Sequence, residues 1–183
     1  MSPTRPHHRS AARRTARLSA LLATMFALVL TGLGTPTAHA LPAWRDSGAS
    51  WQNPVDGTTR VVGLRYATHP SFDRVVIDVR GVIPDWSTRY QRIFHYEGSG
   101  ARVPIRARSG LSLTLSGAAH DSAGRNVYTG PRIARPRFDT LKALAMTGDF
   151  EGQVNFAFAL RHRAAYRIFV LHSPQRLVID FRH

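Results

Sequence analysis

The feature that most constrains this chain is an alternating pattern that occurs in two distant segments. The first reads Arg-Val-Val-Ile-Asp-Val-Arg over residues 74–80, and the second reads Arg-Leu-Val-Ile-Asp-Phe-Arg over residues 176–182. Successive side chains of an extended chain point to opposite faces. Each segment therefore has one wholly apolar face and one face that carries Arg, Val, Asp and Arg in the same order. The pattern predicts two β-strands that each bury one face.

Other segments also read as strands. Residues 153–160 alternate in the same way, so that Gln153 and Asn155 face away from an apolar row. Shorter β-type runs occupy residues 61–66, 103–105, 111–115 and 166–171. Many short strands separated by turn residues predict an all-β fold of two packed sheets, a β-sandwich, in a single domain with little or no helix.

Two further segments need a choice of interpretation. Residues 138–146 contain helix-forming residues, but they lie between strand-like segments and lack a good N-cap, so we predict a strand. Residues 86–96 alternate aromatic and polar side chains, which predicts one face made of Trp86, Tyr90, Phe94 and Tyr96. Such a row either packs in a core or stacks on sugar rings.

The first forty residues have the pattern of an export signal. Five arginines precede an uncharged apolar stretch, and Ala38-His39-Ala40 fits a small-x-small cleavage site. We expect a signal peptide over residues 1–40 that is cleaved after Ala40, by the general secretory route or, given Arg13-Arg14, the twin-arginine route. No membrane span is expected in the remainder. Residues 41–59 are rich in Pro, Gly and polar side chains and predict a flexible linker to a domain over residues 60–183.

The charge balance and the absence of cysteine limit the function further. Five of the 25 basic residues and none of the 11 acidic residues precede Leu41, which leaves a net charge of +9 on residues 41–183. A basic, exported surface attracts polyanions such as teichoic acids or carboxylate-bearing glycans. Without cysteine there are no disulfides and no thiolate chemistry, so stability rests on burial alone.

The order of motifs resembles the AMIN domain, a small β-domain of periplasmic N-acetylmuramoyl-L-alanine amidases and type IV pilus secretins. The matching pieces are residues 72–80 and 166–181, and between them lies a long insert. The insert carries Gly98-Ser-Gly100, His120-Asp121, Tyr128-Thr-Gly-Pro131 and Gly148-Asp-Phe-Glu-Gly152. This arrangement is similar to the AMIN-like variant of exported actinobacterial proteins and would cover residues 59–183. The resemblance implies two packed sheets, a place in the cell envelope, binding to peptidoglycan and no catalysis.

Several residues are candidates for a binding site. If the two echoing strands lie together, their polar faces form either an ion ladder or a grip on glycan carboxylates. The residues concerned are Arg74, Asp78, Arg176 and Asp180. Amide and loop side chains add further candidates that can hydrogen-bond a glycan, namely Gln153, Asn155, His120, Asp121 and Tyr128.

Two other functions remain open from the residues alone. An envelope hydrolase would need His120, Asp121, Asp149 and Glu151 to converge in one pocket. A carrier of an apolar ligand would need a closed barrel with an unfilled interior. The chain has no metalloprotease, serine-hydrolase or phosphate-loop motif, so we expect no cofactor and no bound metal.

The sequence thus favours a non-catalytic, exported module of the cell wall or extracellular space. Its expected partner is peptidoglycan or an anionic wall polymer, with an envelope protein as a further partner. Nucleic-acid binding has only the net charge in its favour, without interleaved basic and aromatic motifs, and is not expected.

Overall fold

The computed structural model describes residues 40–183, so the expected signal peptide lies almost wholly outside the described residues. Within that range the chain forms no α-helix, and hence no helix that could span a membrane. The ten strands are β1 (Ser50–Trp51), β2 (Thr59–Thr68), β3 (Phe72–Gly81), β4 (Trp86–Tyr90), β5 (Ser109–Ser116), β6 (Ile133–Ala134), β7 (Leu141–Phe150), β8 (Gln153–Leu160), β9 (Tyr166–Leu171) and β10 (Arg176–Arg182).

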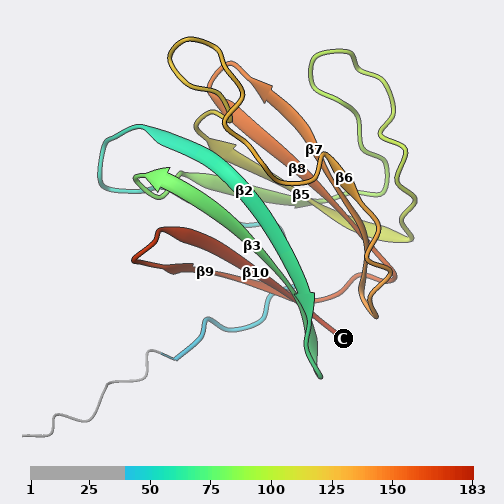
Figure 1. The fold of residues 1–183 in the computed structure, drawn as a ribbon. Coiled ribbons are helices and arrows are strands. Elements are labelled where there is room, and N and C mark those ends of the chain that lie inside the picture. Colours follow the sequence, from blue (N-terminus) through green and yellow to red (C-terminus); the bar gives the residue numbers. More distant parts are fainter. Residues whose placement is uncertain (1–39) are drawn as a thin grey trace, which may run out of the picture. The chain divides into compact units, whose positions relative to one another are not determined.

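The strands form two antiparallel sheets that pack face to face (Figure 1). Sheet A has four strands in the order β2-β3-β10-β9. Sheet B has six in the order β1-β4-β5-β8-β7-β6. The prediction of an all-β fold with two packed sheets is confirmed.

The two echoing segments are neighbours in sheet A. Strands β3 and β10 pair antiparallel with Arg74 opposite Asp180 and Asp78 opposite Arg176. Because the pairing is antiparallel, the equal patterns place the first arginine of each strand against the aspartate of the other. Arg74 donates two hydrogen bonds to Asp180, from Nε at 2.6 Å and from Nη2 at 2.9 Å. Asp78 instead pairs with Arg65 of β2, at 2.7 Å and 3.0 Å.

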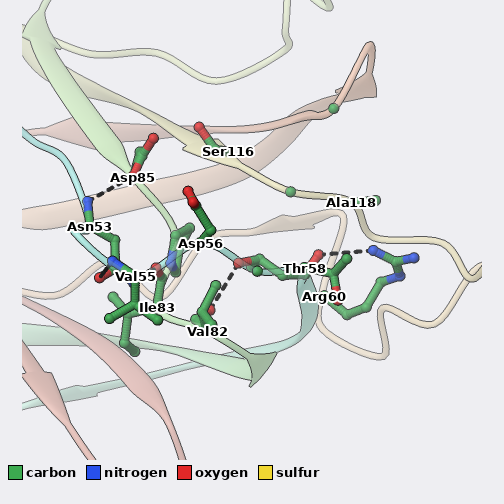
Figure 2. A pocket seen from close by; sticks show the side chains of 15 residues that line it. Asn53, Val55, Asp56, Thr58, Arg60, Val82, Ile83, Asp85, Ser116 and Ala118 are labelled. Carbon is green, nitrogen blue, oxygen red and sulfur yellow. Dashed lines mark hydrogen bonds between the residues drawn. The ribbon is translucent and has the colours of Figure 1, made fainter.

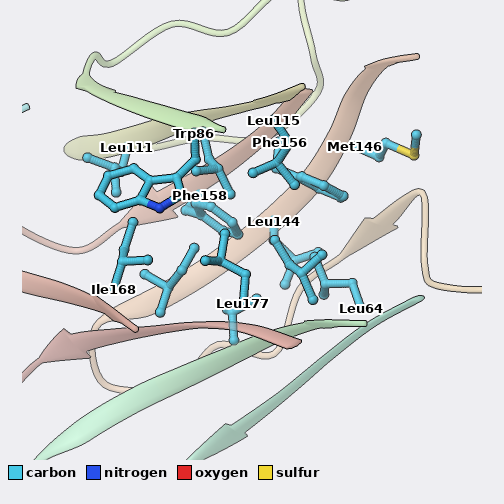
Figure 3. Packing of buried hydrophobic residues seen from close by; sticks show 14 of the residues in the cluster. Leu64, Trp86, Leu111, Leu115, Leu144, Met146, Phe156, Phe158, Ile168 and Leu177 are labelled. Atoms are coloured by element: carbon cyan, nitrogen blue, oxygen red, sulfur yellow. The ribbon is translucent and has the colours of Figure 1, made fainter. Parts of the chain in front are cut away.

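The apolar faces of the two sheets fill the interior between them (Figure 3). Phe158 of sheet B and Phe181 of sheet A lie 5.4 Å apart between ring centroids. Leu111, Ile77 and Leu177 have no exposed surface. The sheets remain separate and the space between them is occupied by side chains, so the alternative of a closed barrel with an unfilled interior is wrong.

A buried carboxylate links the sheets at one end. Asp73 of β3 accepts hydrogen bonds from the backbone N–H groups of Thr140 and Leu141, at 2.8 Å and 2.7 Å. It also accepts from Thr68 Oγ1 at 2.8 Å and lies 3.0 Å from His183 Nε2. Burial alone would raise the pKa of Asp73, but these hydrogen bonds favour the charged form and together lower it. The ionised carboxylate fixes the start of β7 against sheet A.

The strand predicted over residues 138–146 exists, although β7 starts at Leu141 and runs on to Phe150.

The single aromatic face predicted over residues 86–96 is wrong, because β4 ends at Tyr90. Trp86 packs in the core between the sheets, whereas Phe94 belongs to a second apolar cluster together with Ala143, Ala145, Ala157 and Ala159. The strand predicted over residues 103–105 is a loop whose apolar side chains are buried in that second cluster.

The segment 41–59 is not a flexible linker in the structure. Arg45 exchanges two backbone hydrogen bonds with Tyr166 of β9, at 2.9 Å and 2.8 Å. Strand β1 then pairs with β4 at the edge of sheet B. Trp44 stacks under the guanidinium of Arg167, 4.3 Å from ring centroid to Cζ. Residues 41–183 therefore form one compact unit.

Candidate functional site

The outer face of sheet B carries a row of short polar side chains. In β5 the leucines point into the core, so period-two alternation turns the hydroxyl residues between them outward. Strands β4 and β8 flank β5 and contribute further polar groups in register. The outward residues of the three strands are Ser87, Arg89, Ser112, Thr114, Ser116, Gln153 and Asn155.

Two hollows that share Thr114 lie on this face, and we call them together the polar groove. One has a volume of about 430 Å³ and is lined by residues of β1, β4, β5 and β8, including Trp51 and Gln153. The other, of about 180 Å³, lies under residues 91–97 and includes Arg89 and Asn155. The groove thus runs across β1, β4, β5 and β8, with Trp51 at one edge.

Hydrogen bonds inside the groove hold some polar groups and leave others available. Thr114 Oγ1 donates to Asn155 Oδ1 at 2.7 Å, and Ser112 Oγ donates to the Arg89 carbonyl at 3.0 Å. Asn155 Nδ2 has no hydrogen bond to any residue in the described range, so its two donors remain free. The Arg89 guanidinium makes one bond, from Nη2 to Gln91 Oε1 at 3.1 Å. The groove can therefore both donate hydrogen bonds to a ligand and accept them.

A third hollow adjoins the groove through Asp85 and Ser116 (Figure 2). It measures about 330 Å³ and lies where residues 53–60 meet the segment after β3. Asp85 accepts a hydrogen bond from the Asn53 backbone N–H at 2.8 Å, and Asp56 lines the same space. With two carboxylates against a single arginine, Arg60, this hollow disfavours anions.

The candidate residues in sheet A lie on the other sheet from the groove, and their polar groups bind partners within sheet A or in the turn between β9 and β10. Asp180 has no exposed surface and is held by Arg74 and Arg167. The Arg176 side chain donates to the Pro174 carbonyl at 3.1 Å. Of the ion ladder expected from the sequence, only the Arg74–Asp180 pair forms, because Asp78 pairs with Arg65 and Arg176 makes no ion pair within residues 40–183.

Comparison with protein families now adds to the geometry. The family model of the AMIN-like domain matches residues 59–183, more than half of the chain. The chain belongs to the AMIN-like domain family. The resemblance seen in the sequence is therefore confirmed. No curated protein matches the chain.

Membership in the AMIN-like family sets the general context of the site. Domains of this kind are cell-envelope modules of periplasmic or exported proteins, and they are generally non-catalytic binding modules. The polar groove of this AMIN-like domain is therefore a candidate binding surface.

The insert of the AMIN-like domain brings together only part of the proposed hydrolase residues. His120 Nδ1 lies 2.8 Å from Asp149 Oδ2, and the other oxygen of Asp149 accepts the Ala119 N–H at 3.0 Å. Asp121 instead closes its own turn with Arg125, whose backbone N–H and guanidinium hold the pKa of the Asp121 carboxyl below its usual range. Glu151 is exposed in the turn before β8.

Neither a metal-binding cluster within residues 40–183 nor a free Tyr128 hydroxyl accompanies the His120–Asp149 pair. Residues 40–183 contain no group of three or more His, Asp or Glu side chains that could hold a metal. Tyr128 is buried, and its hydroxyl donates to the Pro131 carbonyl at 3.1 Å. None of the three hollows described above is lined by His120, Asp121, Asp149 or Glu151.

Of the nine residues proposed from the sequence, the groove contains Gln153 and Asn155. Its hydroxyl residues on β5 were missed, although the sequence alternates Leu with Ser or Thr over residues 111–116. That alternation is a usable signal. It is also typical of any solvated strand, which is why it did not stand out.

Proposed function

We propose that this AMIN-like domain is an exported envelope module that binds the glycan strands of peptidoglycan in the polar groove. The observation that carries the proposal is the row of outward hydroxyl and amide side chains across β4, β5 and β8, which lines two joined hollows. Glycans present many hydroxyl and acetamido groups, which need donors and acceptors in alternation. The row supplies both.

The chemistry of the row suits a sugar polymer. Its Ser and Thr side chains are short, so little conformational entropy is lost when they bind. Trp51 at the edge of the groove has 38 % of its surface exposed and offers a flat apolar surface for a sugar ring. Arg89 is exposed and can pair with a carboxylate of the peptide stem. No residue of the groove has to act on a bond, which agrees with a non-catalytic role.

A retention experiment tests the proposal. Residues 41–183 are mixed with purified sacculi stripped of anionic polymers, and bound protein is measured at low and high salt. We expect retention to survive high salt, because neutral hydrogen bonds are screened far less than surface charges. The combined change Thr114→Val, Gln153→Ala and Asn155→Ala should lower the affinity by about tenfold, or about 1.4 kcal/mol.

The matched control is Asn126→Ala, which removes an amide in the insert, away from the groove. It should leave retention unchanged. Equal retention by the groove variant and the unmodified protein would contradict the proposal, as would complete loss of binding at high salt.

A further inference from the structure

A second surface, at one end of sheet B, has a different chemistry. Strands β5 and β7 begin there and β8 ends there, with Ser109 and Leu141 both opposite Leu160. The chain around these ends encloses a hollow of about 420 Å³. Its lining consists of Arg106, Ala107, Arg108, Lys142, Leu160 and Arg161, and we call it the basic hollow.

Within the part of the chain that the structure describes, the four cations of the basic hollow have no carboxylate partner. None of them forms an ion pair with any residue of the range 40–183. Lys142 Nζ donates to the Phe138 carbonyl, and Arg161 Nε donates to the Asp139 carbonyl at 2.7 Å. The Asp139 carboxylate itself lies 4.0 Å from His183 and does not line the hollow. Four like charges around one space repel each other, and an anion bound among them removes that repulsion.

The backbone around the hollow is fixed by packing. Ala107 packs against the second apolar cluster, in which Val103 and Ile105 are buried. Arg135 Nη2 donates to the Pro104 carbonyl at 2.7 Å and so ties down the same loop. Arg106 and Arg108 therefore extend from a held segment, and their guanidinium groups make no hydrogen bond to another described residue. Their donors stay free for a ligand.

The third hollow, which is lined by Asp56 and Asp85, lies toward the opposite end of β5. Strand β5 begins beside the basic hollow at Ser109 and ends at Ser116, which lines the hollow with Asp56 and Asp85. Eight residues of strand span about 25 Å. The charge of the domain is thus separated along β5, and an anionic polymer is directed to the basic end.

We propose that the basic hollow binds the phosphate groups of a soluble phosphodiester polymer. Arginine presents parallel N–H donors that match phosphate oxygens, and several cations in one hollow match a chain of closely spaced negative charges. The lining contains no aromatic ring on which a nucleobase could stack. The large exposed apolar residues of the described range, such as Trp51, Ile93 and Phe150, do not line it, so it lacks an anchor for a bilayer. This site is separate from the polar groove.

The test measures binding of fluorescently labelled poly(glycerol phosphate) to residues 41–183 by anisotropy. The hollow variant is Arg106→Gln with Arg108→Gln, and Arg161→Gln is a second, independent variant. The control is Arg80→Gln with Arg92→Gln, which removes the same charge from exposed positions outside the hollow. Thermal unfolding of each variant confirms that it is folded.

We expect the hollow variant to lower the affinity by about tenfold and the control by less than about twofold. Equal losses in both would overturn the proposal, because diffuse net charge would then account for binding. Equal binding of polygalacturonate, lost in the same variants, would assign the hollow to carboxylates instead. Binding to phosphatidylglycerol vesicles without binding to the soluble polymer would assign it to a membrane surface.

The experiments distinguish failure of the groove proposal from failure of the basic-hollow proposal. The basic-hollow variants keep the polar groove intact, so their retention on stripped sacculi should equal that of the unmodified protein. Loss of poly(glycerol phosphate) binding with sacculus binding retained supports a second site. The reverse pattern in the groove variant supports the first.

Discussion

At the scale of single residues, the buried carboxylate of Asp180 depends strongly on its neighbours. Its carboxylate is fully buried on the outer side of sheet A and is held by Arg74 and Arg167. Both guanidinium groups also lie over aromatic rings, that of Arg74 4.9 Å from the centroid of Phe72. Rings and arginines together keep water from the carboxylate, so the charge depends on its two partners.

Replacing Asp180 with alanine leaves two half-buried guanidinium groups without their anion. We expect Asp180→Ala to lower the free energy of unfolding by about 3 kcal/mol, which urea denaturation of residues 41–183 would measure. The comparison is Asp78→Ala, which breaks the pair with the exposed Arg65 and should cost less than about 1 kcal/mol. Similar losses for both variants would show that burial does not strengthen the Asp180 pairs.

At the scale of secondary-structure elements, the sequence predicts strands well where one face is buried and the other is solvated. Strand β3 follows that pattern, whereas β8 and β10 were identified from the alternation in their sequence although both of their faces are buried. The pattern misleads after Tyr90, because the chain leaves the sheet and Phe94 is buried against the outer face instead. Alternation alone cannot distinguish burial between the sheets from burial under a loop.

The candidate sites, too, could be predicted from the sequence only in part. Gln153 and Asn155 could be proposed from alternation in β8, but the groove also needs the order of strands, which places β5 between β4 and β8. The basic hollow joins residues 106–108 to Arg161, which are distant along the chain. Only the sheet register brings them together, and no local sequence signal encodes it.

Gly110 of β5 permits close packing of the strand against Phe158 and Phe94. A Cβ on Gly110 would lie 2.6 Å from the Phe158 carbonyl oxygen and 2.6 Å from Phe94 Cζ. The backbone oxygen cannot move without breaking the sheet, so we expect Gly110→Ala to destabilise the fold by about 2 kcal/mol. Gly98→Ala is the control, because nothing lies within 4 Å of its added Cβ. Equal unfolding midpoints for the two variants in urea would refute the close packing described here.

At the scale of the whole molecule, residues 41–58 join the edges of both sheets. Arg45 pairs with β9 at the edge of sheet A, and β1 pairs with β4 in sheet B. The Tyr166 hydroxyl donates to the Ser47 carbonyl at 2.9 Å and lies 2.5 Å from Thr88 Oγ1, so one side chain connects the segment to both sheets. This segment precedes the range that matches the family model, yet it completes the sandwich.

A domain cut at the family boundary should therefore be less stable than the compact unit. Without residues 41–58, the edges of β9 and β4 lose their backbone partners and Arg167 loses the ring of Trp44, which exposes two strand edges that favour aggregation. We expect residues 59–183 to melt more than about 5 °C below residues 41–183 in thermal unfolding followed by circular dichroism. Residues 44–183 serve as the control, because the three residues removed precede Trp44 and the Arg45 pairing, and their melting temperature should match that of the longer chain. If residues 59–183 melted at the same temperature, the backbone pairings of the N-terminal segment would contribute nothing to the stability of the fold.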